Sequence, residues 1–194
     1  MKLNTKTELR ERFKELRRQL SAEDEDAFNA KLLLQFQQFI WQGLSYIHVF
    51  LPIKKFKEPN TLMLINWLSE NYPEIQLVIS KSDLKTNVMD HYLWDKDQIL
   101  ELNKWGIEEP QGGKVILPHQ IDGVIIPLLA FDKRGERIGY GKGFYDRFLS
   151  ACRPDCLKIG LSFFEPIDKI EDTDPTDIAL DYCITSQKTW KFKV

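Results

Sequence analysis

One short segment of the chain, residues 135–149, combines residue types that together could bind a phosphorylated ligand. It reads GERIGYGKGFYDRFL, and four of its first nine residues are glycines. Glycine lets backbone N–H groups approach a ligand closely, and the start of a following helix favours an anion. Arg137 and Lys142 add positive charge, and Asp146 could hold a magnesium ion against phosphates. The segment is therefore a candidate site for a polyphosphate.

The glycine spacing matches neither of two well-known phosphate-binding motifs. The segment lacks the G-x-x-x-x-G-K-[ST] of a Walker A loop. Gly139, Gly141 and Gly143 are spaced G-x-G-x-G, and not G-x-G-x-x-G as in dinucleotide-binding folds. On the glycines alone, a turn that only links a strand to a helix is an equally good interpretation. The added cations, the aromatic pair Phe144 and Tyr145, and the nearby carboxylate favour a binding site.

Hydrophobic patterning predicts that this segment lies between a buried strand and a helix. Residues 123–129 (GVIIPLL) form the most continuous apolar run, typical of a central strand with both faces covered. Pro127 should stand at the end of that strand, because proline donates no ladder hydrogen bond. In open α/β sheets, ligands bind beyond the carboxyl ends of the strands, which is where the glycine segment would lie.

The other elements alternate in a way that predicts the fold class. Helices are expected over residues 6–20, 22–40, 61–72 and 144–151, and strands over 46–51, 76–80, 86–94, 123–129, 157–163 and 181–185. Residues 103–118 read mostly as loop. This order predicts an α/β fold, a single three-layer α/β/α domain over residues 1–194 with a mixed, mainly parallel sheet. The strand at 86–94 is expected to be antiparallel, and Ile40 to face inward.

The first helix carries cations that share one face. Lys6, Arg10 and Arg17 lie at spacings of four and seven residues. Without further information, cations on a helix are expected to lie on its solvent-exposed surface. That interpretation suffices for Arg12, Lys14 and Arg18.

Composition excludes several classes of protein. The chain is 43% hydrophobic and 29% charged with a formal net charge of -2, so it has no global attraction to nucleic acid or anionic membrane. It contains no apolar run long enough to span a bilayer and no apolar signal-peptide centre, so a cytoplasmic protein is expected. The histidines and cysteines show no metal-site spacing, and the cysteines are interpreted as reduced structural thiols. These residues are His48, His91, His119, Cys152, Cys156 and Cys183.

Residues 126–149 (IPLLAFDKRGERIGYGKGFYDRFL) closely resemble the signature segment of the 5-formyltetrahydrofolate cyclo-ligase family, also called 5,10-methenyltetrahydrofolate synthetases. The resemblance runs collinearly over essentially the whole chain. Its most specific part is the arginine before G-x-G-x-G, two aromatics and an aspartate. Further matching stretches are Lys6-x-x-Leu9-Arg10, residues 20–24, Phe50-Leu51 and WGIEEP at 105–110. The fold implied is NagB/RpiA/CoA transferase-like.

The resemblance implies an ATP- and magnesium-dependent reaction of folate one-carbon metabolism. In it, 5-formyltetrahydrofolate is cyclised to 5,10-methenyltetrahydrofolate, and ADP and phosphate are released. The implied route phosphorylates the formyl oxygen, after which the nitrogen at position 10 attacks the activated carbon. An amide oxygen has no proton to lose, so this first step depends on positioning and charge neutralisation more than on a strong base. The protein is expected to act as a monomer, with no nucleic acid or membrane partner.

The resemblance also implies roles for individual residues. ATP binding is implied for Lys6, Arg10, Arg137, Ile138, Gly139, Tyr140, Gly141, Lys142, Gly143, Phe144 and Tyr145. Within this set, catalytic roles are implied for Arg137, Lys142 and Tyr145. Folate binding is implied for Leu51, Glu58, Tyr140, Gly141, Lys142, Gly143 and Phe144. Magnesium binding is implied for Asp146 and Asp181.

Some of these assignments have structural alternatives. Glu58 could be an exposed loop acid, and Asp146 a first-turn helix acid favoured by the helix dipole. Trp105 could pack on the substrate or simply be a partly buried tryptophan. The chain departs from the common family pattern at Phe144, where tyrosine is usual, and at Lys142, where glycine is frequent. Neither change removes a group that the chemistry requires.

Two other functions remain open from the sequence. One is another small-molecule phosphotransferase that uses the same glycine segment. The other is a catalytically silent folate- or nucleotide-binding protein, against which the retention of Lys6, Arg137 and Asp146 argues. A nucleic-acid-binding role has no basic face to support it.

Overall fold

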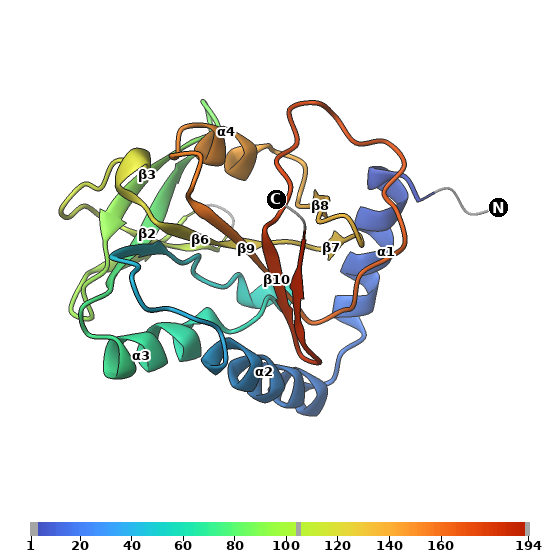
Figure 1. Ribbon diagram of the computed structural model, residues 1–194, viewed down its shortest axis with the longest axis horizontal. Helices are drawn as coiled ribbons and strands as arrows, with labels where there is room; N and C mark the ends of the chain where they lie inside the picture. Colours follow the sequence, from blue (N-terminus) through green and yellow to red (C-terminus); the bar gives the residue numbers. More distant parts are fainter. Residues whose placement is uncertain (1–3, 104–105, 193–194) are drawn as a thin grey trace.

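The structure, a computed structural model, describes residues 4–103 and 106–192. Its centre is a seven-stranded sheet in the order β11-β10-β9-β6-β1-β2-β3 (Figure 1). Its strands are β1 (Tyr46–His48), β2 (Gln76–Asp83), β3 (Val88–Leu93), β6 (Gly123–Pro127), β9 (Leu157–Ser162), β10 (Tyr182–Thr185) and β11 (Thr189–Lys191). Only β3 and β11, at the two edges, pair antiparallel with their neighbours. The predicted α/β class with a mixed, mainly parallel sheet is confirmed.

Helices cover both faces of this sheet. α2 (Ala22–Gln37) and α3 (Thr61–Asn71) lie on one face, and α4 (Phe144–Ser150) lies on the other (Figure 1). Side chains of the central strand β6 alternate accordingly: Ile125 packs in the cluster with α2 and α3, whereas Val124 and Ile126 pack in the cluster with α4. The residues of both clusters are buried, so both faces of β6 are covered. This explains why the sequence of β6 is a continuous apolar run.

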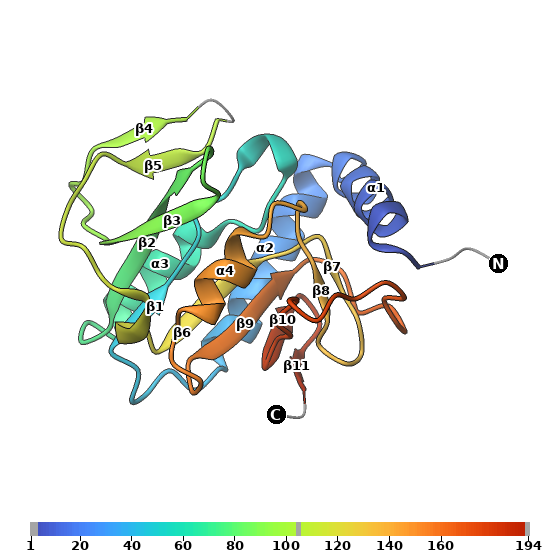
Figure 2. The same cartoon turned by 90° about the horizontal axis from the view of Figure 1, so that it is seen from above.

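Helix α1 (Lys6–Arg18) lies beside the layers rather than within them (Figure 2). A capping box between Thr5 and Glu8 starts it, as the sequence indicates. Its buried Leu9 and Phe13 pack against the chain that follows β6, where β7 (Ala130–Phe131) pairs with β8 (Arg137–Ile138). This packing brings the start of the chain next to the glycine segment.

Several boundaries differ from the sequence prediction. β1 ends at His48 and not at residue 51, because the chain leaves the sheet where the Phe50 carbonyl accepts a hydrogen bond from Thr61 Oγ1 (2.5 Å). The loop predicted at 103–118 is wrong in part, since it contains β5 (Glu108–Pro110), which pairs with β4 (Leu100–Leu102), and its last residue begins the short 3-10 helix Pro118–Gln120. The expectation for Ile40 is also wrong: α2 ends at Gln37, and Ile40 is 75% exposed.

Other expectations hold. Pro127 ends β6, and the strand at 86–94 is the antiparallel β3. The polar stretch between β1 and α3 contains one 3-10 turn, Lys54–Phe56. In the part of the chain that the structure describes, no helix is both long and apolar enough to cross a bilayer.

Candidate active site

A cavity of about 370 Å³ lies beyond the carboxyl ends of the central parallel strands. His48 at the end of β1, Ser80 in β2 and Pro127 at the end of β6 contribute to its lining. This is the edge of the sheet at which α/β proteins bind ligands, because the crossover connections diverge there. Glycine-segment residues 139–146 line it as well, as predicted.

The structure brings most of the predicted site residues to this one cavity. Two of them come from α1 and two from the chain after β1. The predicted residues that line the cavity are Lys6, Arg10, Leu51, Glu58, Arg137, Gly139, Tyr140, Gly141, Lys142, Gly143, Phe144, Tyr145 and Asp146. Ile138 is 1% exposed and belongs to the core around α1 instead. Asp181 is not part of the lining, and Trp105 lies outside the described residues.

Gly135, Gly141 and Gly143 of the segment have conformations that other residues rarely adopt, and the last two line the cavity. Gly141 has φ of +89°, and Gly143, the N-cap of α4, has φ of +67°. A β-carbon at Gly141 would lie 3.3 Å from the Arg10 guanidinium, and one at Gly143 would lie 3.0 Å from Arg147 Nη1. Glycine is therefore required here both for the backbone turn and for close approach of cations. The segment is a strand-to-helix turn and a cavity wall at the same time.

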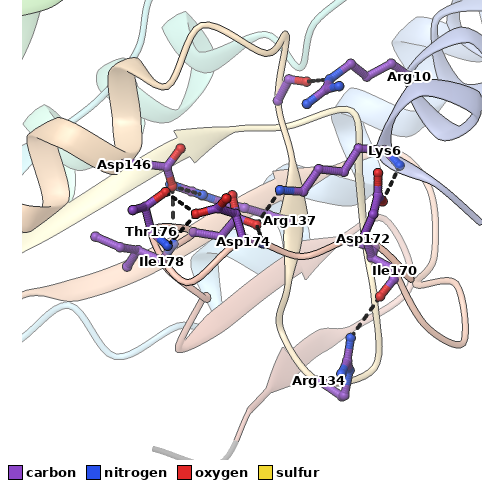
Figure 3. Close-up of polar contacts among 12 residues, drawn as sticks. Lys6, Arg10, Arg134, Arg137, Asp146, Ile170, Asp172, Asp174, Thr176 and Ile178 are labelled. Atoms are coloured by element: carbon purple, nitrogen blue, oxygen red, sulfur yellow. Dashed lines mark hydrogen bonds and ion pairs between the residues drawn. The ribbon is translucent and has the colours of Figure 1, made fainter.

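Helix α1 delivers two cations to the glycine segment (Figure 3). Arg10 Nε donates to the Gly139 carbonyl at 3.1 Å. The ammonium of Lys6 pairs with the carboxylate of Asp177, in the loop before β10. The backbone N–H of Lys6 donates to Asp172 Oδ1 at 2.6 Å, so this loop is attached to the first turn of α1. Lys6 is not a solvated surface cation, since its side chain is only 16% exposed.

Arg137 and Asp146 form an ion pair at the cavity, in which the Arg137 side chain is only 6% exposed. Both Arg137 Nη1 and Nη2 donate to Asp146 Oδ1, at 2.9 and 3.0 Å, and the Ile178 N–H donates to the same oxygen at 3.2 Å (Figure 3). Burial lowers the pKa of Arg137, and the charge of Asp146 opposes that shift. Within the described ranges, no hydrogen bond reaches Oδ2 of Asp146. That oxygen suits a divalent cation whose other ligands are phosphate oxygens and water.

Asp181 occupies a different part of the fold. It directly precedes β10 and accepts hydrogen bonds at Oδ2 from the backbone N–H and the ammonium of Lys158, both at 2.8 Å. Because β10 runs parallel to β9 and β6, Asp181 stands at the amino end of its strand, whereas the cavity lies beyond the carboxyl ends. The structure thus does not bring Asp181 together with Asp146. No cluster of three or more His, Cys, Asp or Glu side chains able to hold a metal occurs among residues 4–103 and 106–192.

Glu58 lines the same cavity and is buried, with 7% exposure. Its Oε2 accepts the Ile53 N–H and its Oε1 accepts the Tyr140 hydroxyl, both at 2.8 Å. Burial raises the pKa of Glu58, and the charge of Arg17 opposes the shift. Burial and the Glu58 charge also raise the pKa of Tyr140, so its phenol stays a donor. Glu58 is therefore not the exposed loop acid that the sequence alone allows.

Two histidines, His48 and His91, form a pair at the cavity. The sequence did not reveal this pair. Ser80 Oγ is 2.7 Å from His48 Nε2 and 3.0 Å from His91 Nδ1. Burial lowers the pKa of His91 to about 4 and that of His48 in the same direction, so both imidazoles are neutral at neutral pH. Burial likewise raises the pKa of Tyr145, which lines the cavity above them. Neutral imidazoles and phenol give this side of the cavity uncharged polar groups.

The sequence model of the 5-formyltetrahydrofolate cyclo-ligase family matches residues 2–186. The chain belongs to this family. A probable 5-formyltetrahydrofolate cyclo-ligase of Schizosaccharomyces pombe is 29% identical over 163 residues, which cover 76% of this chain and 78% of the relative. The cyclo-ligase of Mycoplasma genitalium is 45% identical over 74 residues, which cover 38% of this chain and 44% of the relative.

Solved structures of cyclo-ligases have the same fold. The 5,10-methenyltetrahydrofolate synthetase of Aquifex aeolicus aligns with a TM-score of 0.82 at 26% identity, covering 97% of this chain and 93% of that one. The enzyme of Mycoplasma pneumoniae aligns with a TM-score of 0.74 at 25% identity, covering 93% and 98%. Membership of the cyclo-ligase family and its expected fold are thereby confirmed, and the chain is an enzyme of the ligase class.

Asp177 is another cavity residue that the sequence analysis missed. It lies within EDTDPTD at 171–177, where it is one of several acids with no spacing that distinguishes it. Its importance follows only from its contact with Lys6, which lies 171 positions earlier in the chain. No local pattern carries such a signal.

Proposed function

We propose that the chain catalyses the ATP- and magnesium-dependent cyclisation of 5-formyltetrahydrofolate to 5,10-methenyltetrahydrofolate, with release of ADP and phosphate. One observation carries this proposal. A single cavity is lined by the cations Lys6, Arg10 and Arg137 with the glycine segment, and also by the buried carboxylate of Glu58. The cations and the glycine segment suit a polyphosphate, and the carboxylate suits the paired N–H donors of a pterin.

The nucleotide side depends on fixed charge. Lys6, Arg10 and the segment 137–145 would bind ATP, with Arg137 and Lys142 neutralising charge on the transferred phosphoryl group. Asp146 would hold magnesium through Oδ2, while its Oδ1 remains bound to Arg137. When bound, magnesium supplies charge neutralisation and orientation of the phosphates.

The folate side depends on shape and hydrogen bonding. Leu51 gives an apolar surface to the pterin ring, and Glu58 would accept its N–H donors. Residues 140–144 would lie between the two substrates, so the formyl oxygen can meet the terminal phosphate. Phe144 keeps an aromatic contact, but without the hydroxyl that is usual in the family. Tyr145 would donate a hydrogen bond as a neutral phenol.

The chemistry then follows from proximity. The formyl oxygen attacks the terminal phosphorus of ATP, ADP leaves, and the formyl carbon becomes electrophilic. The nitrogen at position 10 attacks that carbon, loses its proton, and phosphate departs to leave the methenyl bridge. The enzyme is proposed to act as a monomer in the cytoplasm. The implied metal role of Asp181 has no support in its position and stays a prediction from the family resemblance.

The experiment mixes purified protein with 5-formyltetrahydrofolate, ATP and magnesium and follows the near-ultraviolet absorbance of the methenyl product. We expect product only when all three are present, with ADP and phosphate in equal amounts. ADP formation without methenyl product would favour another phosphotransferase. Binding of both ligands without turnover would favour a silent binding protein. Either outcome rejects the proposal.

A further inference from the structure

Arg17 is a helix cation that does not reach solvent. It lies in the last turn of α1 and is only 2% exposed. Its Nη2 donates to the Leu128 carbonyl at 2.5 Å, and its Nη1 donates to the Tyr140 hydroxyl at 3.2 Å. Its neighbour Arg18 has a side chain that is 70% exposed, where it pairs with Glu15. The chain therefore buries one arginine of an adjacent pair at considerable desolvation cost, and that cost needs an explanation.

The charge that compensates Arg17 is Glu58. Among the residues that the structure describes, no carboxylate forms a direct ion pair with Arg17. Tyr140 connects the two instead: its hydroxyl accepts from Arg17 Nη1 and donates to Glu58 Oε1 at 2.8 Å. The result is a buried series of guanidinium, phenol and carboxylate. Such a series fixes the orientation of each member because every rotation breaks a hydrogen bond in low dielectric.

This arrangement leaves Glu58 able to accept more. Each carboxylate oxygen has two acceptor positions, and Tyr140 and the Ile53 N–H use one on each oxygen. The remaining two positions can accept a parallel pair of N–H donors only if the carboxylate is ionised. The titratable or charged groups that act on Glu58 come from three elements: Arg17 in α1, Tyr140 in the glycine segment and Tyr145 in α4. Arg17 is the only cation of these three.

We infer that Arg17 is a positioning residue for folate recognition: it holds the Tyr140 phenol against Glu58 and keeps the Glu58 carboxylate ionised for the paired N–H donors of the substrate. The inference rests on the proposed function and adds a residue with no contact to either substrate. It also explains why the first helix carries a cation beyond the two that face the nucleotide. Arg17 serves the folate side of the cavity, and Lys6 and Arg10 serve the nucleotide side.

The test compares Arg17→Met, which keeps much of the side-chain volume, with Arg18→Met as the exposed matched control. Calorimetry measures the dissociation constants of 5-formyltetrahydrofolate and of ATP between pH 6 and pH 8. For Arg17→Met we expect folate binding about tenfold weaker at pH 6, with recovery toward pH 8, and ATP binding within twofold of the parent. Arg18→Met should match the parent in both. Equal weakening of both ligands, or no weakening, would overturn the inference.

A second measurement needs no folate. The carboxyl carbon of Glu58, labelled with ¹³C-glutamate and assigned with Glu58→Gln, is titrated by NMR in the parent and in Arg17→Met. We expect the pH midpoint of the Glu58 titration to be higher in Arg17→Met than in the parent. An unchanged midpoint would contradict the inference. If Arg17→Met does not fold, Arg17→Gln replaces it, because the amide can still donate a hydrogen bond but carries no charge; the same two shifts are expected. Failure of the parent to bind 5-formyltetrahydrofolate would reject the proposed function, and the titration would still decide the role of Arg17.

Discussion

Arg137 and Asp146 meet at a single oxygen. Both guanidinium Nη atoms donate to Asp146 Oδ1, at 2.9 and 3.0 Å, and the arginine side chain is only 6% exposed. The pair therefore does two things: it gives the buried guanidinium a hydrogen-bond acceptor, and it orients the second carboxylate oxygen. These two functions can be separated by substitution, because an amide preserves the first and removes the second.

Asp146→Asn and Asp146→Ala should both lose magnesium-dependent turnover by at least about a hundredfold, since neither carries the charge that holds the ion. Asp146→Ala should also lose stability, by about 1–3 kcal/mol, because it leaves the buried Arg137 without its acceptor, whereas Asp146→Asn keeps an acceptor and should lose less. Turnover at varied magnesium and urea unfolding measure the two effects. Asp155→Asn, an exposed acid paired with Arg153, is the control and should change neither. Near-normal turnover in Asp146→Asn would remove the metal role.

Lys6→Ala should raise the Michaelis constant for ATP by tenfold or more, because the ammonium faces the nucleotide wall of the cavity. Asp177→Asn should not raise it, since its carboxylate pairs with Lys6 and would compete with phosphate for the same ammonium. Initial rates at varied ATP test both variants. Arg12→Ala, on the exposed side of the same helix, is the control. An unchanged constant in Lys6→Ala would exclude phosphate contact.

Asp181→Asn should lower the free energy of unfolding by about 1.5–3 kcal/mol, because it weakens charged hydrogen bonds to Lys158. Its requirement for magnesium should match that of the parent, since the side chain stands at the amino end of β10. Urea unfolding and a magnesium titration of turnover measure the two effects. A folded variant with a greatly increased magnesium requirement would instead support the metal role that the family resemblance implies.

Acid should destabilise the fold through His91 and His48. Burial lowers the pKa of His91 from its ordinary value of 6.5 to about 4, so the unfolded state binds more protons between these pH values. Stability is then fully present above about pH 6.5 and is lost as the pH falls toward 4. For His91 alone, the loss between pH 7 and pH 5 is about 2 kcal/mol.

Replacing His91 by Gln should flatten this pH dependence, because glutamine keeps a polar side chain beside Ser80 but does not titrate. His48 contributes in the same direction and remains in the variant, so part of the slope should survive. Urea unfolding at several pH values gives the comparison, and His119→Gln serves as a control from an exposed position. A slope equal to that of the parent would show that His91 does not titrate with unfolding.

Local patterns in the sequence were sufficient for the main elements. The apolar run at 123–129 marks the central strand because both of its faces are covered, and the capping box at Thr5 and Glu8 marks the start of α1. The glycine segment could be placed at the carboxyl edge of the sheet because a strand precedes it and a helix follows. Short pairings such as β4 with β5 were missed, because three-residue strands have too little periodicity to identify.

The sequence by itself determined the fold class, the family and the segment that forms one wall of the cavity, because these depend on residue types and spacings within short stretches of chain. Only the tertiary structure decided which charged groups meet. Arg17 is connected to Glu58 by hydrogen bonds through Tyr140, and Lys6 forms an ion pair with Asp177. Asp181 is held by Lys158, away from Asp146. Such contacts join residues far apart in the chain, so the packing of α1 against the chain after β6 and the pairing of β10 within the sheet create them, and no local pattern specifies them.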